Sequence, residues 1–251
     1  MEPLLVVEGL TKSFGGLKAV RAFNCRVNQR TVHALIGPNG AGKTTVFNLI
    51  SGLLKPDAGR IRLEGRELTG LPAHMVSRAG IGRTFQTIRV FRDLTAEENV
   101  LVGLYAHSGV SVVRSALRPP VDRKLRREVE AALELVGLAP SAGTLARNLS
   151  YGEQKRLEMA RALAWGPRVL LLDEPTAGMN PTEAAAIMQT IARIREAGRT
   201  VMLVEHNMRV VMDVSDWITV MDFGEVIAEG TPDRVTSDER VIKAYLGERK
   251  C

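Results

Sequence analysis

An eight-residue loop at positions 37–44 constrains this chain more than any other stretch. Its sequence, GPNGAGKT, matches the pattern G-x-x-x-x-G-K-[ST] of phosphate-binding loops. The apolar run 31–36 before it predicts a buried strand, and the residues 45–50 after it predict a helix. This order of strand, glycine loop and helix is the context that the motif requires. The sequence therefore predicts a nucleotide-binding unit at the centre of the chain.

Each part of the loop suits a triphosphate. Glycines let the backbone turn tightly and direct N–H groups inward, and the start of the next helix presents further unpaired N–H groups. Lys43 adds a positive charge for the β- and γ-phosphates, and the Thr44 hydroxyl is a ligand for Mg²⁺. The residues expected to bind ATP here are Gly37, Pro38, Asn39, Gly40, Ala41, Gly42, Lys43, Thr44 and Thr45.

Two adjacent carboxylates follow a second apolar run, at 169–172. A run that is apolar throughout is typical of a strand buried on both faces. Ligands bind at the carboxyl ends of such strands in open α/β sheets. Asp173 suits Mg²⁺, directly or through a water molecule. Glu174 is one residue further on and points differently, so it can act as the general base toward a water that attacks the γ-phosphate.

A third motif is a capped helix start that follows Leu149. Ser150 and Glu153 form the S-x-x-E pattern of a capping box. One interpretation is simply a well-capped helix. The other is a second anion-binding helix terminus, with the Ser150 hydroxyl and the Gly152 N–H directed at a phosphate. Because one ATP already has a phosphate loop, a second phosphate-facing terminus suggests that two chains share each nucleotide.

Composition favours a folded chain with no membrane span. The chain has 251 residues, of which 45% are hydrophobic, enough for one large domain or for one domain with an inserted piece. No apolar run approaches the roughly 18 residues of a membrane helix. The start, Met1-Glu2-Pro3, lacks the pattern of a signal peptide. We interpret Cys25 and Cys251 as reduced thiols.

Part of the net charge of +6 is concentrated in the run 114–127, which carries six Lys/Arg residues and one Asp. A basic run favours contact with anionic lipid or nucleic acid. A basic helix face exposed to solvent explains the run equally well, so the run alone does not indicate a function.

The order of elements predicts an α/β fold with a helical insertion. Short strands before and after the phosphate loop predict an antiparallel unit, and later strands that alternate with helices predict a parallel sheet. The expected strands are 4–10, 19–27, 31–36, 60–65, 81–86, 169–172, 200–204, 217–220 and 225–229, with a turn-rich link at 11–16 between the first two. The expected helices outside the insert are 45–50, 72–79, 181–197 and 240–246. Residues 1–86 and 149–251 would form the nucleotide-binding core, and 87–148 the inserted helical subdomain. Within the insert, Thr95 and Glu98 form a capping box that predicts the start of one helix.

Together these motifs resemble the ATPase subunit of ABC transporters. The phosphate loop, Gln86, the signature L-S-x-G-[EQ] at 149–153, the acidic pair 173–174 and His206 occur in that family's order. The resemblance covers nearly the whole chain. It implies a P-loop NTPase core with a mixed sheet, an N-terminal antiparallel β subdomain and an inserted helical subdomain. It also implies that the chain hydrolyses ATP with Mg²⁺, as a head-to-tail dimer around two ATPs.

The resemblance assigns roles residue by residue. Phe14 matches the aromatic residue that stacks on adenine, and His206 matches the histidine that contacts the γ-phosphate. Gln86 matches the glutamine that touches Mg²⁺ or the attacking water. The expected catalytic residues are Glu174, His206 and Gln86. The expected metal ligands are Thr44, Gln86 and Asp173. The residues expected to bind the opposite protomer's ATP are Ser150, Gly152 and Glu153.

Some details depart from the commonest family pattern and narrow the subfamily. Tyr151 stands where glycine is usual, and Asn180 where aspartate is frequent; Asn still caps a helix well. The stretches RTFQ at 83–86, AGMNP at 177–181, AEGTP at 228–232 and AYLGE at 244–248 resemble the ATPases of bacterial branched-chain amino acid importers. The basic insert at 108–127 resembles that of the larger ATPase paralogue.

This resemblance implies a peripheral subunit on the cytoplasmic face of the inner membrane. The implied partners are a second ATPase subunit, identical or not, transmembrane permease subunits and, indirectly, a periplasmic or extracellular substrate-binding protein. No nucleic acid is expected. The segment 87–91 suits docking to the permease, and simple packing explains it as well. Alternatives are another ABC system (a lipopolysaccharide-type exporter or a urea/amide importer) and a soluble ABC ATPase such as a cluster-assembly factor.

Overall fold

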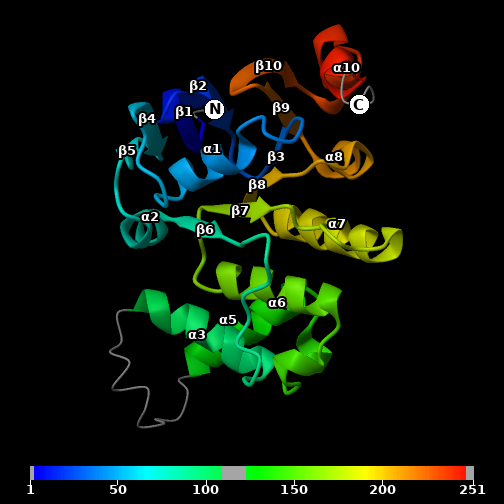
Figure 1. Ribbon diagram of the computed structural model, residues 1–251. Coiled ribbons are helices and arrows are strands. Elements are labelled where there is room, and N and C mark those ends of the chain that lie inside the picture. The colour runs from blue at the N-terminus through cyan, green and yellow to red at the C-terminus, as the bar shows by residue number, and fades with distance from the viewer. Residues whose placement is uncertain (1–2, 109–122, 247–251) are drawn as a thin grey trace.

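The computed structural model describes residues 3–108 and 123–246 of the chain. In this part the strands form two sheets, with helices packed around them (Figure 1). Three parts of the chain that were discussed above lie outside these ranges: residues 114–122 of the basic run, residues 247–248 of the AYLGE stretch, and Cys251. No helix in the described ranges is long and apolar enough to cross a membrane.

One sheet is antiparallel and has the order β2-β1-β4-β5. Its strands are β1 (Leu5–Phe14), β2 (Leu17–Val27), β4 (Ala58–Leu63) and β5 (Arg66–Glu67). The first strand continues through residues 11–14, where the sequence predicted a turn-rich link. The Asp57 carboxylate accepts hydrogen bonds from the Lys12 ammonium and the Ser13 N–H, both at 2.7 Å, and these contacts hold that end of the strand in the sheet.

The other sheet has the order β10-β9-β3-β8-β7-β6. Its strands are β3 (Val32–Ile36), β6 (Ile81–Arg83), β7 (Val169–Asp173), β8 (Thr200–Val204), β9 (Trp217–Asp222) and β10 (Glu225–Gly230). The pairings among β9, β3, β8, β7 and β6 are parallel, as predicted. The edge strand β10 pairs antiparallel with β9, so the sheet is mixed.

The central strands are apolar throughout because both of their faces are covered. In β7, Leu170 and Leu172 join the hydrophobic core that includes α6 and α7, while Val169 and Leu171 join the core around α1 and the antiparallel sheet. Successive side chains of a strand point to opposite faces, so one short run supplies both cores. The sequence pattern therefore identified these strands correctly.

Helices cover both faces of the mixed sheet. They are α1 (Lys43–Ile50), α2 (Ala73–Ala79), α7 (Pro181–Glu196), α8 (Met208–Val214), α9 (Pro232–Thr236) and α10 (Glu239–Leu246). The predicted cap of α7 is present, because the Asn180 side chain accepts from the Glu183 N–H and the Glu183 carboxylate accepts from the Asn180 N–H. The two short helices α8 and α9 were not predicted.

Three helices of 13 residues each pack on one another, at the end of the molecule opposite the antiparallel sheet (Figure 1). They are α3 (Ala96–Ser108), α5 (Arg123–Leu135) and α6 (Tyr151–Leu163), and we call them the helical lobe. The predicted capping box of Thr95 and Glu98 starts α3. The limits 87–148 of an inserted subdomain stay a prediction; α6, which begins after them, packs against α3 and α5.

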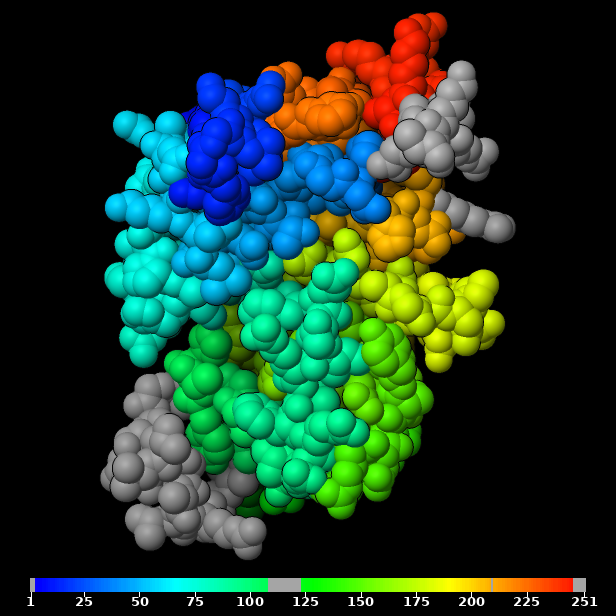
Figure 2. Space-filling view, in the orientation of Figure 1, coloured from blue at the N-terminus to red at the C-terminus, as the bar shows by residue number. Residues whose placement is uncertain are grey.

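The stretch 84–95 contains neither strand nor helix and lies at the surface beside the helical lobe (Figure 2). The sequence predicted a strand to 86 and helical patterns from 87. Instead, β6 ends at Arg83, and the buried Asn99 side chain binds backbone groups of the stretch. It accepts from the Phe91 N–H at 2.8 Å and donates to the Phe91 and Leu94 carbonyls. These contacts satisfy backbone groups that a helix would otherwise pair.

Candidate functional site

The predicted site residues follow the carboxyl ends of four parallel strands. The phosphate loop follows β3, Gln86 lies three residues after β6, Glu174 follows β7, and His206 lies two residues after β8. Because β3, β8, β7 and β6 are parallel neighbours in that order, these ends share one edge of the sheet. The fold thus brings together motifs that are far apart in the sequence.

The phosphate loop leaves room for no side chain at two of its glycines. A Cβ atom at Gly37 would lie 2.0 Å from the Met221 carbonyl oxygen, and one at Gly42 would lie 2.4 Å from the Ala19 carbonyl oxygen. Gly42 has a φ of 100° and precedes α1 without a side-chain cap, so the first N–H groups of the helix are available to an anion. The buried Lys43 ammonium donates to the Gly37 carbonyl at 2.6 Å and reaches the next carbonyl at 2.8 Å.

A pocket of about 400 Å³ opens over this loop. Residues 39–45 line it together with Phe14, Glu174 and the exposed Phe223. The fold therefore places the predicted adenine-stacking residue, the phosphate loop and the predicted base around one pocket. Sequence reasoning missed Phe223, because an aromatic residue in the turn between β9 and the edge strand β10 carries no motif.

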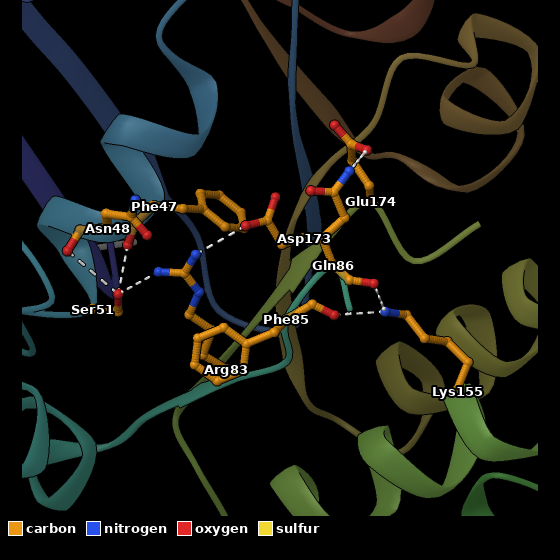
Figure 3. A network of polar contacts seen from close by, with 9 residues as sticks. All are labelled: Phe47, Asn48, Ser51, Arg83, Phe85, Gln86, Lys155, Asp173 and Glu174. Atoms are coloured by element: carbon orange, nitrogen blue, oxygen red, sulfur yellow. Dashed lines mark hydrogen bonds and ion pairs between the residues drawn. The ribbon is translucent and has the colours of Figure 1, made fainter. Parts of the chain in front are cut away.

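Asp173 lies at the end of β7, where the Arg83 guanidinium donates to its Oδ2 atom at 2.9 Å (Figure 3). Arg83 also donates to the Ser51 hydroxyl at 2.6 Å, and its guanidinium lies 5.3 Å from the ring centre of Phe85 and 5.9 Å from that of Phe47. Burial lowers the pKa of Arg83, and Asp173 opposes that shift. In the sequence analysis Arg83 appeared only within the RTFQ stretch at 83–86, and no role was predicted for it.

Glu174 turns away from the direction of the strand. Its φ is +46°, in the left-handed region, and its N–H donates to the Val204 carbonyl at 3.0 Å. The Gln86 amide nitrogen donates to the Glu174 carboxylate at 2.7 Å (Figure 3). The structure therefore brings together two of the three predicted catalytic side chains.

The third, His206, lies beside the phosphate pocket rather than in its lining. It lines a separate groove between α7 and α8, together with residues 176–179. The fully buried Glu205 carboxylate before it accepts from the Thr176 N–H at 2.9 Å, the Thr176 hydroxyl at 2.6 Å and the His206 N–H at 3.2 Å. Glu205 therefore ties His206 to the turn that follows Glu174, a role that no sequence motif had indicated.

The Ser150 helix terminus is also separate from the phosphate pocket and contributes no residue to its lining. Its capping box is present: the Glu153 N–H donates to the Ser150 hydroxyl at 3.3 Å, and the Glu153 carboxylate accepts from the Ser150 N–H at 2.9 Å. The bonds that the Glu153 carboxylate accepts from the Ser150 N–H and from the Ser150 hydroxyl lower the pKa of Glu153. The Tyr151 hydroxyl donates to the Ala177 carbonyl at 3.3 Å. Ser150, Gly152 and Glu153 are thus not brought to this chain's own loop.

The predicted metal ligands form an oxygen donor set that suits Mg²⁺. Arg83 contacts Oδ2 of Asp173, so the Oδ1 atom can serve a cation. The Gln86 amide uses its nitrogen toward Glu174, which directs its carbonyl oxygen elsewhere. Thr44 lines the pocket and offers its hydroxyl. These residues fit the ion as a group.

Comparison with known proteins gives a consistent result. Residues 20–177 match the sequence model of the ABC transporter family, and residues 225–250 match that of the branched-chain amino acid ATP-binding cassette transporter. The chain is 47% identical to the high-affinity branched-chain amino acid transport ATP-binding protein BraF of Pseudomonas aeruginosa, over 98% of each chain.

Solved structures agree. The crystal structure of the ADP conformation of an ATP-binding cassette of an ABC transporter has a TM-score of 0.87 and 33% identity, covering 98% of this chain and 100% of that one. A dimeric structure of a bacterial ABC transporter cassette has a TM-score of 0.76 and 26% identity, covering 91% and 98%. The family and the fold class predicted from the motifs are confirmed, and this chain belongs to the ABC transporter family as one of its ATP-binding cassettes.

Proposed function

We propose that this chain is the ATP-hydrolysing subunit of a membrane importer of branched-chain amino acids. The observation that carries the ATPase part is the position of Glu174 in the pocket that the phosphate loop and Phe14 also line. The importer part is supported by the similarity to BraF along nearly the whole chain and by the separate match of residues 225–250.

In this proposal, the chain's residues divide the work of binding and hydrolysis. Phe14 stacks on the adenine ring, and the loop N–H groups and Lys43 hold the phosphates. Thr44, Asp173 and Gln86 would hold Mg²⁺, which would neutralise negative charge on the phosphates. Glu174 accepts a proton from the attacking water, and the Gln86 amide orients the Glu174 carboxylate by the bond between them.

The site is completed by a second ATPase subunit. Ser150, Gly152 and Glu153 lie outside the phosphate pocket of their own chain, so a head-to-tail partner would bring its own copy of this helix terminus to the γ-phosphate. The dimeric form of a related cassette supports this arrangement. His206 would contact the same phosphate once the nucleotide is enclosed. ATP binding would then close the dimer, and hydrolysis would reopen it.

Transport requires permease subunits, and we place the chain on the cytoplasmic face of the inner membrane against them. The surface stretch 84–95 and the helical lobe would pass the motion of the dimer to the permease. Gln86, Thr87 and Arg89 are exposed there, and Phe91 is half exposed. A substrate-binding protein outside the membrane would select the amino acid.

A reconstitution tests the proposal. The chain is co-expressed with candidate permease subunits and a candidate second ATPase subunit, purified from membranes and placed in liposomes with a candidate substrate-binding protein. We expect leucine, isoleucine or valine to stimulate ATP hydrolysis and to accumulate inside, while urea or lipopolysaccharide gives no stimulation. If the chain purifies only in a soluble complex, without hydrophobic subunits, the transport proposal is wrong and a soluble ABC ATPase is the better assignment.

A further inference from the structure

A buried lysine joins the helical lobe to the segment that carries Gln86. Lys155 lies in the second turn of α6 and its side chain is only 1% exposed. Its ammonium donates to the Phe85 carbonyl at 2.7 Å and to the Gln86 carbonyl at 3.2 Å (Figure 3). The two carbonyls belong to the successive peptide groups on either side of the Gln86 α-carbon, so a single side chain fixes the backbone on both sides of that residue.

Glu158, one turn further along α6, completes this contact. Its carboxylate is 2% exposed and lies 3.4 Å from the Lys155 ammonium. It also accepts from the Arg89 N–H at 3.3 Å. Burial raises the pKa of Glu158, and the charges of Lys155 and Arg161 oppose that shift. Two side chains of one helix therefore hold the neighbouring segment at three backbone positions.

Stability alone does not explain this pair. Removing two charges from water costs several kcal/mol per ion, and a buried ion pair is often no more stable than apolar residues of the same volume. What the pair does provide is geometry, because the ammonium donates to two carbonyls while its charge faces the Glu158 carboxylate at 3.4 Å. An apolar side chain at 155 would fill the space and leave both carbonyls without this donor.

The contact lies on a continuous path from the signature motif to the proposed base. Ser150 caps α6, and Lys155 belongs to the same helix. Lys155 binds the Gln86 backbone, and the Gln86 side chain binds Glu174 at 2.7 Å (Figure 3). The helix end predicted to touch one nucleotide is thereby joined, through a single residue's backbone and side chain, to the base predicted to act on the other.

We propose that Lys155 is a positioning residue for ATP hydrolysis: it holds the backbone of residues 85 and 86 against α6, so that the Gln86 side chain keeps the Glu174 carboxylate in place. This inference rests on the proposed ATPase function of the chain. Lys155 touches no nucleotide in this scheme, and it acts through Gln86.

The test is a double-mutant cycle on ATP turnover by the assembled transporter. Lys155→Met, Gln86→Ala and the double variant are compared with the wild type. Arg156→Met is the matched control, because Arg156 lies next to Lys155 on α6 but donates to the Val136 and Gly137 carbonyls instead. Lys155→Arg, whose guanidinium can donate to the same carbonyls, tests for rescue.

We expect Lys155→Met to lower kcat about tenfold or more, by displacing the groups around the water, with KM for ATP changed by no more than about twofold. The double variant should be no slower than Gln86→Ala alone, since Lys155 acts through that residue. Lys155→Arg should recover a large part of kcat, and Arg156→Met should keep it. Lys155→Gln, which can satisfy one carbonyl, provides a second cycle if Lys155→Met does not fold.

Two results would overturn the inference. One is a normal kcat in folded Lys155→Met or Lys155→Gln. The other is an additive cycle, in which the losses from Lys155→Met and Gln86→Ala multiply, because that indicates a structural effect independent of Gln86. Failure of the proposed function is a separate outcome, since in that case the wild-type transporter itself would hydrolyse no ATP.

Discussion

The Arg83 guanidinium lies 2.9 Å from the Asp173 carboxylate, and both side chains are almost completely buried. The two residues face each other because β6 and β7 are parallel neighbours that end at the same sheet edge. The carboxylate predicted to bind Mg²⁺ therefore already has a fixed positive partner on its other oxygen atom, and Arg83 sets its orientation.

Replacing Arg83 by Met should destabilise the fold strongly. It leaves the buried Asp173 charge unpaired, which costs about 3–5 kcal/mol. Added Mg²⁺ with ATP should restore more stability to this variant than to the wild type, since the cation supplies the missing charge. Urea unfolding with and without Mg²⁺–ATP measures both effects. Arg195→Met, which removes an exposed partner of Asp216, is the control and should cost about 1 kcal/mol or less.

Glu174→Gln should keep ATP binding and lose turnover. Glutamine preserves the size of the side chain but cannot accept the proton of the attacking water, so kcat should fall by about a hundredfold or more. Because hydrolysis is what reopens the dimer in our proposal, ATP should trap this variant as a stable dimer. Size-exclusion chromatography with light scattering reports the dimer, and phosphate release reports kcat. A normal hydrolysis rate would exclude Glu174 as the base.

Glu205→Gln should impair hydrolysis although the residue touches no nucleotide. The wild-type carboxylate accepts from Thr176 on one oxygen and from the His206 N–H on the other. A glutamine turns one of those acceptors into a donor, which costs about 1–3 kcal/mol and displaces His206. We expect kcat to fall about tenfold. The comparison is Glu225→Gln, an exposed glutamate of β10, which should behave like the wild type; equal rates in the two variants would contradict the assignment.

The buried His33 should make the fold sensitive to mild acid. Burial lowers its pKa from 6.5 to about 4, and its Nε2 atom lies 2.9 Å from the Thr219 hydroxyl and 3.6 Å from the Cys25 sulfur. Between these two pH values the unfolded chain binds more protons than the folded one, so stability is complete above pH 6.5 and declines as the pH falls toward 4.

The shifted pKa of His33 corresponds to a loss of about 3 kcal/mol in the free energy of unfolding once the pH is well below 4. Urea unfolding of the wild type and of His33→Gln at several pH values isolates this part, because the carboxylates titrate in both proteins. The wild type should lose more stability than the variant between pH 7 and pH 4.5. Parallel curves for the two proteins would rule out His33 as the source.

The sequence predicted features that rest on local patterns. The phosphate loop, the caps at Thr95, Ser150 and Asn180, and the fully apolar strands all follow from residues within a few positions of one another. Arg83 with Asp173 and Lys155 with Gln86 could not be found in this way, because each pair is more than 60 residues apart and only strand order or helix packing brings it together.

Short elements were missed for a related reason. The helix α8 has seven residues and α9 has five, too few for a periodic pattern to stand out. Of the turn-rich link expected at 11–16, residues 15–16 do form a turn, but residues 11–14 belong to β1, where Asp57, distant in the sequence, binds Lys12 and Ser13. Phe14, Gln86 and His206 were identified as site residues only by the resemblance to the family, because composition and spacing alone give no signal for them.

At Glu174, the left-handed backbone lowers stability but directs the side chain into the pocket. A non-glycine residue at a φ of +46° costs roughly 1–2 kcal/mol, and an asparagine or glycine would adopt this conformation more readily. Yet the same rotation turns the side chain from the buried strand into the nucleotide pocket. The chain thus carries a small stability deficit at the residue that we propose as the base, so selection for a more stable fold and selection for a working ATPase would favour different amino acids at one position.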